Sequence, residues 1–454
     1  MALAPAASAG RDLFVGVDED GFKTDPAAAT SDARRLGLRA FRITLLWSPG
    51  RSRVSASESE EVLRAVRTAV ALRPVLAVYA QKPTDAPTTG ARREQYCGFV
   101  RSALARVPSL NDVVIWNEPN KSFFWRPQFD ETGTSVAPAA YEALLARCWD
   151  ALHSLRPTVN VIGPATSPRG NDDPNAVSNV SHSPAAFIRK LGQAYRASGR
   201  RQPILDTIGQ HVHGLTSAEA PSQSHVGGTI AEGDLGKLVS ALRAAFEGTG
   251  QAYPGHCISG KCAAIWYLEA GYQTEPDSAK RKLYTGEENE PRPVADKAAG
   301  SGPDQASQIL AGIRLAYCQP FVEAYFNFLL WDERSLAGWQ SAPYWIDRTP
   351  KDSFRAFKEA IREVNERRVD CGAVTRAAPA AVSTERPAPT PRPPTTGAAP
   401  PPSTAPGSSS RNVARAGENG NSAWKTLVVA VVLATAGVAL TAAWWRRRQG
   451  RGGL

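Results

Sequence analysis

The sequence predicts a closed barrel of eight parallel β-strands, each followed by an α-helix, over residues 11–374 of its 454 residues. Two observations point to this fold. Short apolar runs rich in β-branched and aromatic residues alternate with amphipathic stretches, and eight such pairs fill the available length. The main alternative is an open, doubly wound sheet. That fold would need a glycine-rich phosphate-binding loop after its first strand, and the sequence has none there.

The predicted strands are short and are separated by turn residues and helical periodicity. They cover 13–17, 39–47, 74–79, 113–116, 159–163, 204–211, 263–268 and 322–331. The predicted helices cover 31–37, 60–71, 91–107, 139–155, 185–197, 234–248, 304–318 and 351–367. Because all strands of such a barrel end at one rim, residues that directly follow them are expected to lie near one another.

Two of these strands end at a glutamate. Strand 113–116 runs into the sequence Asn-Glu-Pro-Asn, in which Glu118 is the acid, and the proline cannot continue a strand ladder. Strand 263–268 is followed directly by Glu269. Both carboxyl groups are therefore expected at the rim where barrels of this kind carry their chemistry.

Two carboxyl groups at one cleft are what glycoside hydrolysis requires, because one protonates the leaving oxygen and the other attacks the anomeric carbon. Their surroundings must differ, so that one acid stays protonated while the other is ionised. Arg42 lies inside the apolar strand 39–47 and needs a partner, since an unpaired buried charge is costly. If it points into the mouth of the barrel, it would keep one carboxylate ionised. The alternative for Glu118 is a solvated turn residue, which the presence of Glu269 on the same rim makes the weaker interpretation.

Aromatic side chains are predicted at the same rim, where their rings would suit the C–H faces of sugars. These residues are Trp47, Phe123, Phe124, Trp125, Trp331 and Trp339. For Trp47 and Trp125, packing in the core is an equally good interpretation.

Taken together, these motifs resemble the clan A retaining glycoside hydrolases, which are the cellulase-like and xylosidase-like barrels. The resemblance rests on residues 115–120, 41–43 and 266–272, and it covers the region from about residue 11 to residue 367. It implies a (β/α)₈ barrel that cleaves O-glycosidic bonds by double displacement without a metal or an organic cofactor.

The resemblance also implies roles for individual residues. Glu118 would be the general acid/base and Glu269 the nucleophile. Asn117 would hydrogen-bond the 2-hydroxyl of the sugar, Arg42 would support Glu269, and His211 matches the histidine of the sixth strand.

Two further positions are expected to contact substrate. Trp331 matches the platform after the eighth strand, under the reacting sugar. His213 departs from the pattern, because many members carry a tyrosine two residues after the sixth-strand histidine. A histidine could also hydrogen-bond the nucleophile, but its charge changes near neutral pH, so the pH optimum is open.

The composition changes after residue 374. Residues 375–423 are rich in proline, alanine, serine and threonine, which predicts a disordered linker. Residues 424–445 contain an uncharged apolar run long enough for one transmembrane helix, and the basic residues of 446–454 predict a cytoplasmic C-terminus. The barrel would then lie outside the cell, anchored to the membrane.

The N-terminus and the net charge bear on location and partners. Residues 1–10 end in small residues typical of a signal-peptide cleavage site, so we expect a remnant of a signal peptide whose main part lies upstream. The net charge is +10, but the residues after 374 hold ten lysines and arginines against two glutamates. The barrel itself is therefore close to neutral, and we expect no nucleic-acid partner.

Six cysteines, an even number, fit an oxidising compartment. Cys257 and Cys262 are close enough to close a small loop and are the expected pair, while the pairing of the other four is open. His256 adjoins Cys257, but no second cysteine–histidine pair follows at metal-ligand spacing, so zinc is not expected.

The sequence thus predicts a monomeric, membrane-anchored extracellular retaining glycosidase acting on an oligo- or polysaccharide. One alternative is a transglycosylase that remodels surface glycans with the same residues. Another is a non-catalytic glycan-binding barrel, which would tolerate loss of either glutamate. The sugar, the linkage and endo or exo action are open.

Overall fold

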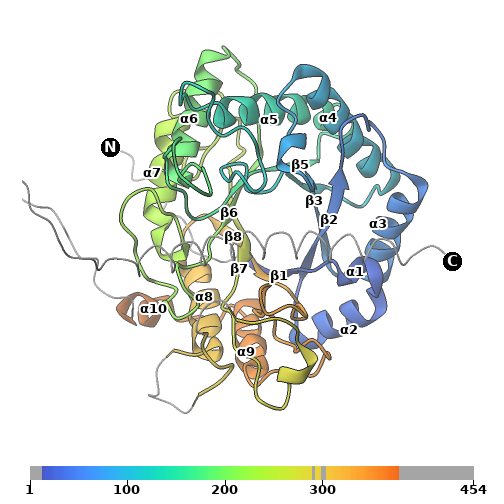
Figure 1. The fold of residues 1–454 in the computed structure, drawn as a ribbon, viewed down its shortest axis with the longest axis vertical. Helices are drawn as coiled ribbons and strands as arrows, with labels where there is room; N and C mark the ends of the chain where they lie inside the picture. Colours follow the sequence, from blue (N-terminus) through green and yellow to red (C-terminus); the bar gives the residue numbers. More distant parts are fainter. Residues whose placement is uncertain (1–12, 289–291, 298–302, 378–454) are drawn as a thin grey trace, which may run out of the picture. The chain divides into compact units, whose positions relative to one another are not determined.

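The computed structural model describes residues 13–288, 292–297 and 303–377. In this part of the chain eight parallel strands close into a barrel in sequence order, each hydrogen-bonded to the next and β8 to β1 (Figure 1). The strands are β1 (Phe14–Asp18), β2 (Ala40–Trp47), β3 (Arg73–Ala80), β4 (Asp112–Ile115), β5 (Asn160–Thr166), β6 (Thr207–His211), β7 (Ile265–Ala270) and β8 (Val322–Phe328). The predicted (β/α)₈ fold is therefore confirmed.

Helices surround the strands, as Figure 1 shows. The α-helices are α1 (Gly21–Thr24), α2 (Pro26–Leu36), α3 (Ala56–Thr68), α4 (Gly90–Arg106), α5 (Ala137–His153), α6 (Pro184–Ala197), α7 (Leu235–Phe246), α8 (Gln305–Cys318), α9 (Phe354–Asn365) and α10 (Cys371–Ala377). Three short 3₁₀ turns, η1 (Pro83–Asp85), η2 (Glu232–Asp234) and η3 (Arg281–Leu283), lie in the loops.

Two helices begin earlier than predicted, because their capping residues lie upstream of the predicted starts. In α3 the Ser55 side chain accepts a hydrogen bond from the backbone of Glu58, whose carboxylate in turn accepts one from Ser55. In α2 Asp25 caps the helix and Pro26 occupies the first position, where its missing N–H costs nothing. The predicted starts at residues 60 and 31 were therefore too late.

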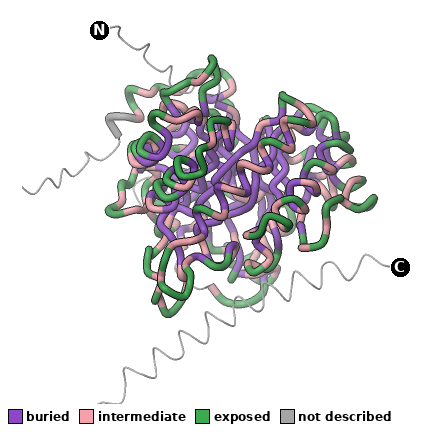
Figure 2. Tube along the Cα trace, turned by 90° about the horizontal axis from the view of Figure 1, so that it is seen from above, coloured by how far each residue is buried: buried purple, intermediate pink, exposed green. Residues whose placement is uncertain are grey.

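The core has two main regions and a small third cluster of Tyr284, Ala295, Leu336 and Trp345, and buried residues fill the centre in Figure 2. One region lies between strands and helices. The other comprises apolar side chains grouped with the strands: Ala40, Val75, Ala77, Val114, Ile162, Ala165, Trp266, Leu268, Ala324 and Phe326. The packing is tight, since a Cβ on Gly16 would come 2.6 Å from the Phe326 ring. Such a packed interior leaves the rim of the barrel as the place for a site.

β8 ends three residues earlier than the predicted range 322–331. Its last residue is Phe328, and the next, Leu329, has a left-handed backbone with φ of 76°. The chain then turns away from the ladder. Trp331 consequently lies beyond the strand.

All six cysteines are paired in three disulfides. Cys257 and Cys262 are bonded, as predicted. Cys97 of α4 bonds to Cys148 of α5, and a third bond joins Cys318 of α8 to Cys371 of α10. Two of the three therefore tie neighbouring helices together.

No helix in the part of the chain that the structure describes is both long and apolar enough to cross a membrane. The predicted transmembrane segment 424–445, the basic tail 446–454 and the expected signal remnant 1–10 lie outside the described residues. α10 continues to Ala377, so the predicted linker start at residue 375 falls within a helix. The remainder of that linker also lies outside the described residues.

Candidate active site

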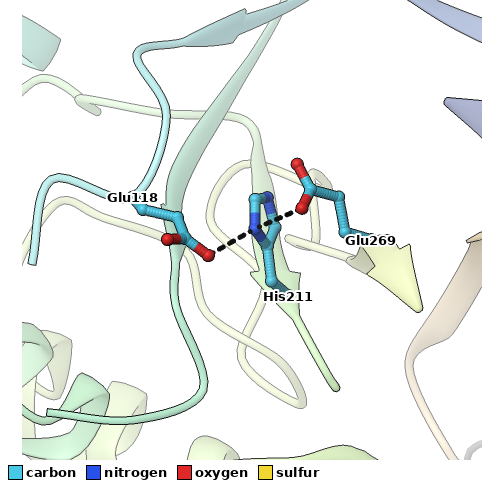
Figure 3. Close-up of side chains that lie close together, drawn as sticks. All are labelled: Glu118, His211 and Glu269. Atoms are coloured by element: carbon cyan, nitrogen blue, oxygen red, sulfur yellow. Dashed lines mark hydrogen bonds and ion pairs between the residues drawn. The ribbon is translucent and has the colours of Figure 1, made fainter. Parts of the chain in front are cut away.

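Two carboxyl groups and one imidazole meet at the C-terminal ends of β4, β6 and β7 (Figure 3). The His211 Nδ1 atom lies 3.0 Å from Oε1 of Glu118 and 3.2 Å from Oε2 of Glu269. The imidazole is fully buried, and its Nε2 atom has no hydrogen-bond partner among the described residues. Nδ1 can donate to an ionised acid or accept the proton of a neutral one, so it couples the proton states of the two glutamates.

The backbone that carries Glu118 is held in an uncommon conformation. Trp116 and Glu118 have φ of 70° and 40°, and neither is glycine. The Tyr141 hydroxyl donates to the Ile115 carbonyl at 2.6 Å, and the Tyr96 hydroxyl accepts from the Trp116 N–H at 3.1 Å. Strained residues persist only where their surroundings hold them, and they gather at functional sites.

Arg42 of β2 connects four groups at the rim. Its Nη1 atom lies 3.0 Å from Glu269 Oε1, 3.0 Å from Asp18 Oδ2 and 3.0 Å from the Leu268 carbonyl. Its Nη2 atom donates to Asn117 Oδ1 at 3.2 Å. With its side chain 1% exposed, this guanidinium is the buried cation predicted to support Glu269.

The two acids beside Arg42 have shifted pKa values in opposite directions. Burial raises the pKa of the Glu269 carboxyl, but the charges of His211 and Arg42 and a contact with His213 outweigh burial and hold that pKa well below its usual range. For Asp18, burial dominates over the attraction of Arg42, and the nearby Glu269 adds repulsion, so the pKa of Asp18 is raised. The site therefore keeps Glu269 ionised and favours a protonated Asp18.

His213 lies beside the nucleophile candidate. Its Nε2 atom is 3.7 Å from Glu269 Oε2, and its ring centroid is 4.5 Å from that of Trp339 and 6.1 Å from that of Phe328. Trp339 is partly exposed. Its ring lies beside His213 with part of its surface exposed, so a sugar could stack on it.

Asn117 is brought to the site as predicted. Its side-chain oxygen is held by Arg42, and the residue is 5% exposed. Nothing among the described residues accepts a hydrogen bond from its amide nitrogen, which leaves that donor free for a ligand hydroxyl.

Two predicted contact residues are placed elsewhere. Trp47 is 2% exposed, donates its indole N–H to the Arg51 carbonyl at 2.7 Å and packs edge-on against Tyr96 in the core. Trp331 donates its indole N–H to Asp32 at 2.8 Å, and the Arg348 guanidinium lies 4.1 Å above its ring. Both indoles are thus engaged away from the paired glutamates.

Sequence reasoning did not single out two residues of the site, Asp18 and Tyr79. Asp18 belongs to an acidic run that looks like a solvated loop, and Tyr79 reads as part of an apolar strand. The Tyr79 pKa is raised by burial and by the charge of Asp20, and it also responds to Arg42 and Glu269. The position of each at the end of a predicted strand was the available signal.

Glu118, His211 and Glu269 also form a group that could hold a metal ion, with one ligand atom from each lying within 4.8 Å of the others. An oxygen–nitrogen–oxygen set of this kind accepts several divalent cations. Binding through Nδ1 would need that nitrogen deprotonated, and it would replace the hydrogen bonds to both acids. The same geometry serves proton transfer without an ion.

Solved structures with a similar fold include glycoside hydrolases. GH5_18 from Streptomyces cattleya, in complex with GlcNAc, is 15% identical and matches 78% of this chain and 81% of that chain with a TM-score of 0.50. A GH5_18 from Bifidobacterium longum subsp. infantis is 13% identical and matches 77% and 79%, also with a TM-score of 0.50. At this identity the likeness shows the barrel fold alone. No protein-family model and no curated protein matches the sequence.

Proposed function

We propose that this barrel is a retaining glycoside hydrolase that cleaves O-glycosidic bonds of a cell-surface or extracellular glycan. The observation that carries the proposal is the pairing of Glu118 and Glu269 at the ends of β4 and β7, where one carboxylate oxygen of Glu118 lies within 4.8 Å of one carboxylate oxygen of Glu269. Retaining enzymes place their acids about 5–5.5 Å apart, whereas inverting enzymes leave about 6.5–9.5 Å for a water molecule.

In the first step Glu118 donates a proton to the glycosidic oxygen while ionised Glu269 attacks the anomeric carbon. The bond to the leaving group breaks and a glycosyl ester forms on Glu269. The low pKa of that carboxyl, set by His211 and Arg42 against burial, supports this assignment of the nucleophile.

In the second step Glu118, now ionised, takes a proton from water as the water attacks the anomeric carbon. The ester bond breaks and Glu269 leaves as a carboxylate. His211 contacts both acids, so a change of charge on one glutamate changes the hydrogen bonding and the electrostatic environment of the other. The free amide donor of Asn117 is available for the 2-hydroxyl, and the Trp339 ring for the sugar face.

The location and partners remain part of the proposal. Three disulfides support folding in an oxidising compartment, which agrees with a barrel displayed outside the cell on a membrane anchor. We propose a monomer that acts on an oligo- or polysaccharide.

The test is to screen the purified protein against aryl glycosides and polysaccharides, together with Glu269→Gln and Glu118→Gln. We expect Glu269→Gln to abolish hydrolysis with the fold intact, and Glu118→Gln to reduce it by about 10²–10⁴-fold. Glu94→Gln is the matched control, since its side chain is 56% exposed in a surface ion pair with Arg147. Wild-type turnover by Glu269→Gln would refute the assignment.

The same screen separates the rival functions. Products extended by an added sugar acceptor would indicate a transglycosylase, which uses the same residues. Glycan binding that persists in both glutamate variants, with no turnover by the wild type, would indicate a non-catalytic barrel.

A further inference from the structure

Two neighbouring cations, Lys121 and Arg169, have no carboxylate partner among the described residues. Lys121 follows Glu118 by three residues, and its backbone N–H donates to the Glu118 carbonyl at 3.0 Å. Its Nζ atom is 3.5 Å from the Arg169 carbonyl. No acidic group among the described residues lies within 4.0 Å of the ammonium or of the Arg169 guanidinium.

These cations are built into the loops that follow three successive strands. Lys121 is in the loop after β4 and Arg169 in the loop after β5. The Arg169 Nη1 atom donates to the Gly214 carbonyl, in the loop after β6, at 2.9 Å. Both side chains are partly buried, so their charges are only partly screened by solvent. The Arg169 side chain thus links the loops after β5 and β6 through its contact with Gly214.

The electrostatic surroundings agree with this geometry. Burial lowers the pKa of Lys121, the charge of Glu118 opposes that change, and the charge of Arg169 lowers the pKa further. Two like charges that repel each other in a half-buried place are costly unless an anion joins them. Glu118 is the acid whose charge raises the pKa of Lys121, and the proposed reaction requires Glu118 to be neutral at the start.

The reaction geometry says which part of the substrate would meet these cations. The anomeric carbon must sit at Glu269 and the leaving oxygen at Glu118, so groups beyond Glu118 face the leaving group. Phe123, two residues after Lys121 and 46% exposed, offers a ring in the same loop. An exposed aromatic beside cations suits a sugar unit that carries a negative charge.

Resting on the proposed glycosidase function, we infer that Lys121 and Arg169 form a leaving-group subsite for a glycan unit bearing an anionic group, a carboxylate or a sulfate. The specificity of the enzyme would then lie in the charge of the unit that departs. Lys121 supplies a point charge and Arg169 a planar donor.

The test uses leaving groups that differ in charge and little in reactivity. A 4-(carboxymethyl)phenyl glycoside, its neutral carboxamide and a 4-(sulfomethyl)phenyl glycoside of one accepted sugar are compared by kcat/KM. We expect the wild type to prefer an anionic leaving group. Lys121→Gln and Arg169→Gln should each reduce the anionic-to-neutral ratio by about 10-fold or more, as loss of one charge-assisted hydrogen bond does. The sulfonate glycoside stands in for a sulfated unit, and its comparison with the carboxylate glycoside shows which kind of anion is accepted better.

Control variants distinguish the loss of a positive charge from damage to the fold. Lys121→Arg should keep the ratio, and Lys190→Gln, which removes an exposed lysine on α6, should leave it unchanged. If a variant does not fold, added NaCl should still lower the wild-type ratio, because exposed parts of the pair are screened. Hydrolysis of the neutral glycoside with a ratio that neither substitution nor salt moves would overturn the subsite alone. No hydrolysis of any glycoside would refute the proposed function, and the subsite with it.

Discussion

Replacing Arg42 with methionine should destabilise the folded protein much more than removal of a surface arginine. Arg42 is the cation that contacts both Asp18 and Glu269, and its side chain is 1% exposed. Methionine keeps much of the volume of the arginine stem but leaves ionised Glu269 without its counter-ion and Asp18 without the cation that favours its ionised form. It also leaves the Asn117 amide oxygen without its donor.

The magnitude follows from burial. Breaking a buried ion pair by removing one partner costs about 3–5 kcal/mol of unfolding free energy, because a buried charge is left uncompensated. Arg147→Ala is the control, since Arg147 and its partner Glu94 are 41% and 56% exposed. Exposed pairs of this kind contribute about 0–1 kcal/mol.

The loss should also depend on pH, with a definite sign. The pKa of Asp18 is already raised in the folded state, so its contribution to stability is present below its unfolded pKa and is lost as pH rises through the folded value. The pKa of Glu269 is lowered, so its contribution is present above its unfolded pKa and is lost as pH falls. Without Arg42 both pKa values move upward. The difference in unfolding free energy between wild type and Arg42→Met should therefore be largest above neutral pH and should become smaller at acidic pH.

Urea unfolding of wild type, Arg42→Met and Arg147→Ala at pH 8 and pH 5 would measure both effects. If Arg42→Met lowers the unfolding free energy at pH 8 by no more than Arg147→Ala does, Arg42 is not the stabilising counter-ion of this cluster. A deficit that grows as pH falls would contradict the linkage to the two carboxyl groups.

Three further predictions concern the reaction and the scaffold. His213→Phe removes one of the groups that lower the pKa of Glu269, so the acidic limb of the kcat/KM profile should move to higher pH, and an unmoved limb would contradict the contact seen here. Trp339→Ala should raise KM by about 10-fold or more through loss of a stacking surface, measured on aryl glycosides, and an unchanged KM would exclude Trp339 as a platform. Joint replacement of Cys97 and Cys148 by alanine removes the disulfide that closes a loop across 51 residues, and it should lower the unfolding free energy measured in urea by up to about 4 kcal/mol. A loss below about 1 kcal/mol would contradict a stabilising role for this disulfide.

The barrel itself was accessible from sequence because its signals are local. Strand-like apolar runs, helical periodicity and the two glutamates after runs 113–116 and 263–268 needed no knowledge of distant contacts. Capping was also readable, as Ser55 with Glu58 shows, but periodicity alone placed that helix start too late.

Alternation along a strand explains the misplacement of Trp47. Arg42 of β2 points to the rim cluster, and residues an odd number of positions away on a regular strand point to the other face. Trp47 accordingly belongs, with Phe41 and Ile43, to the large core cluster shared with the helices, and its ring packs against Tyr96. The sequence therefore held the information that Arg42 and Trp47 could not both face the cleft.

Other features depend on backbone irregularities that no local sequence pattern predicts. Register shifts on both sides of β7, between Gln210 and His211 and between Tyr267 and Ala270, interrupt the regular alternation near Glu269. The left-handed backbone at Leu329 likewise takes Trp331 away from the strand-eight position. Each is a tertiary effect, visible only once neighbouring strands are paired.

The most direct test of the central claim is to trap the intermediate. Wild type and Glu269→Gln are incubated with 2-deoxy-2-fluoro aryl glycosides of the sugar found in the screen, and the peptides are mapped by mass spectrometry. Double displacement predicts one fluoroglycosyl group, on the peptide that contains Glu269, in the wild type alone. Turnover of the parent glycoside with inversion and no labelled peptide, or a label on another residue, would contradict Glu269 as the nucleophile.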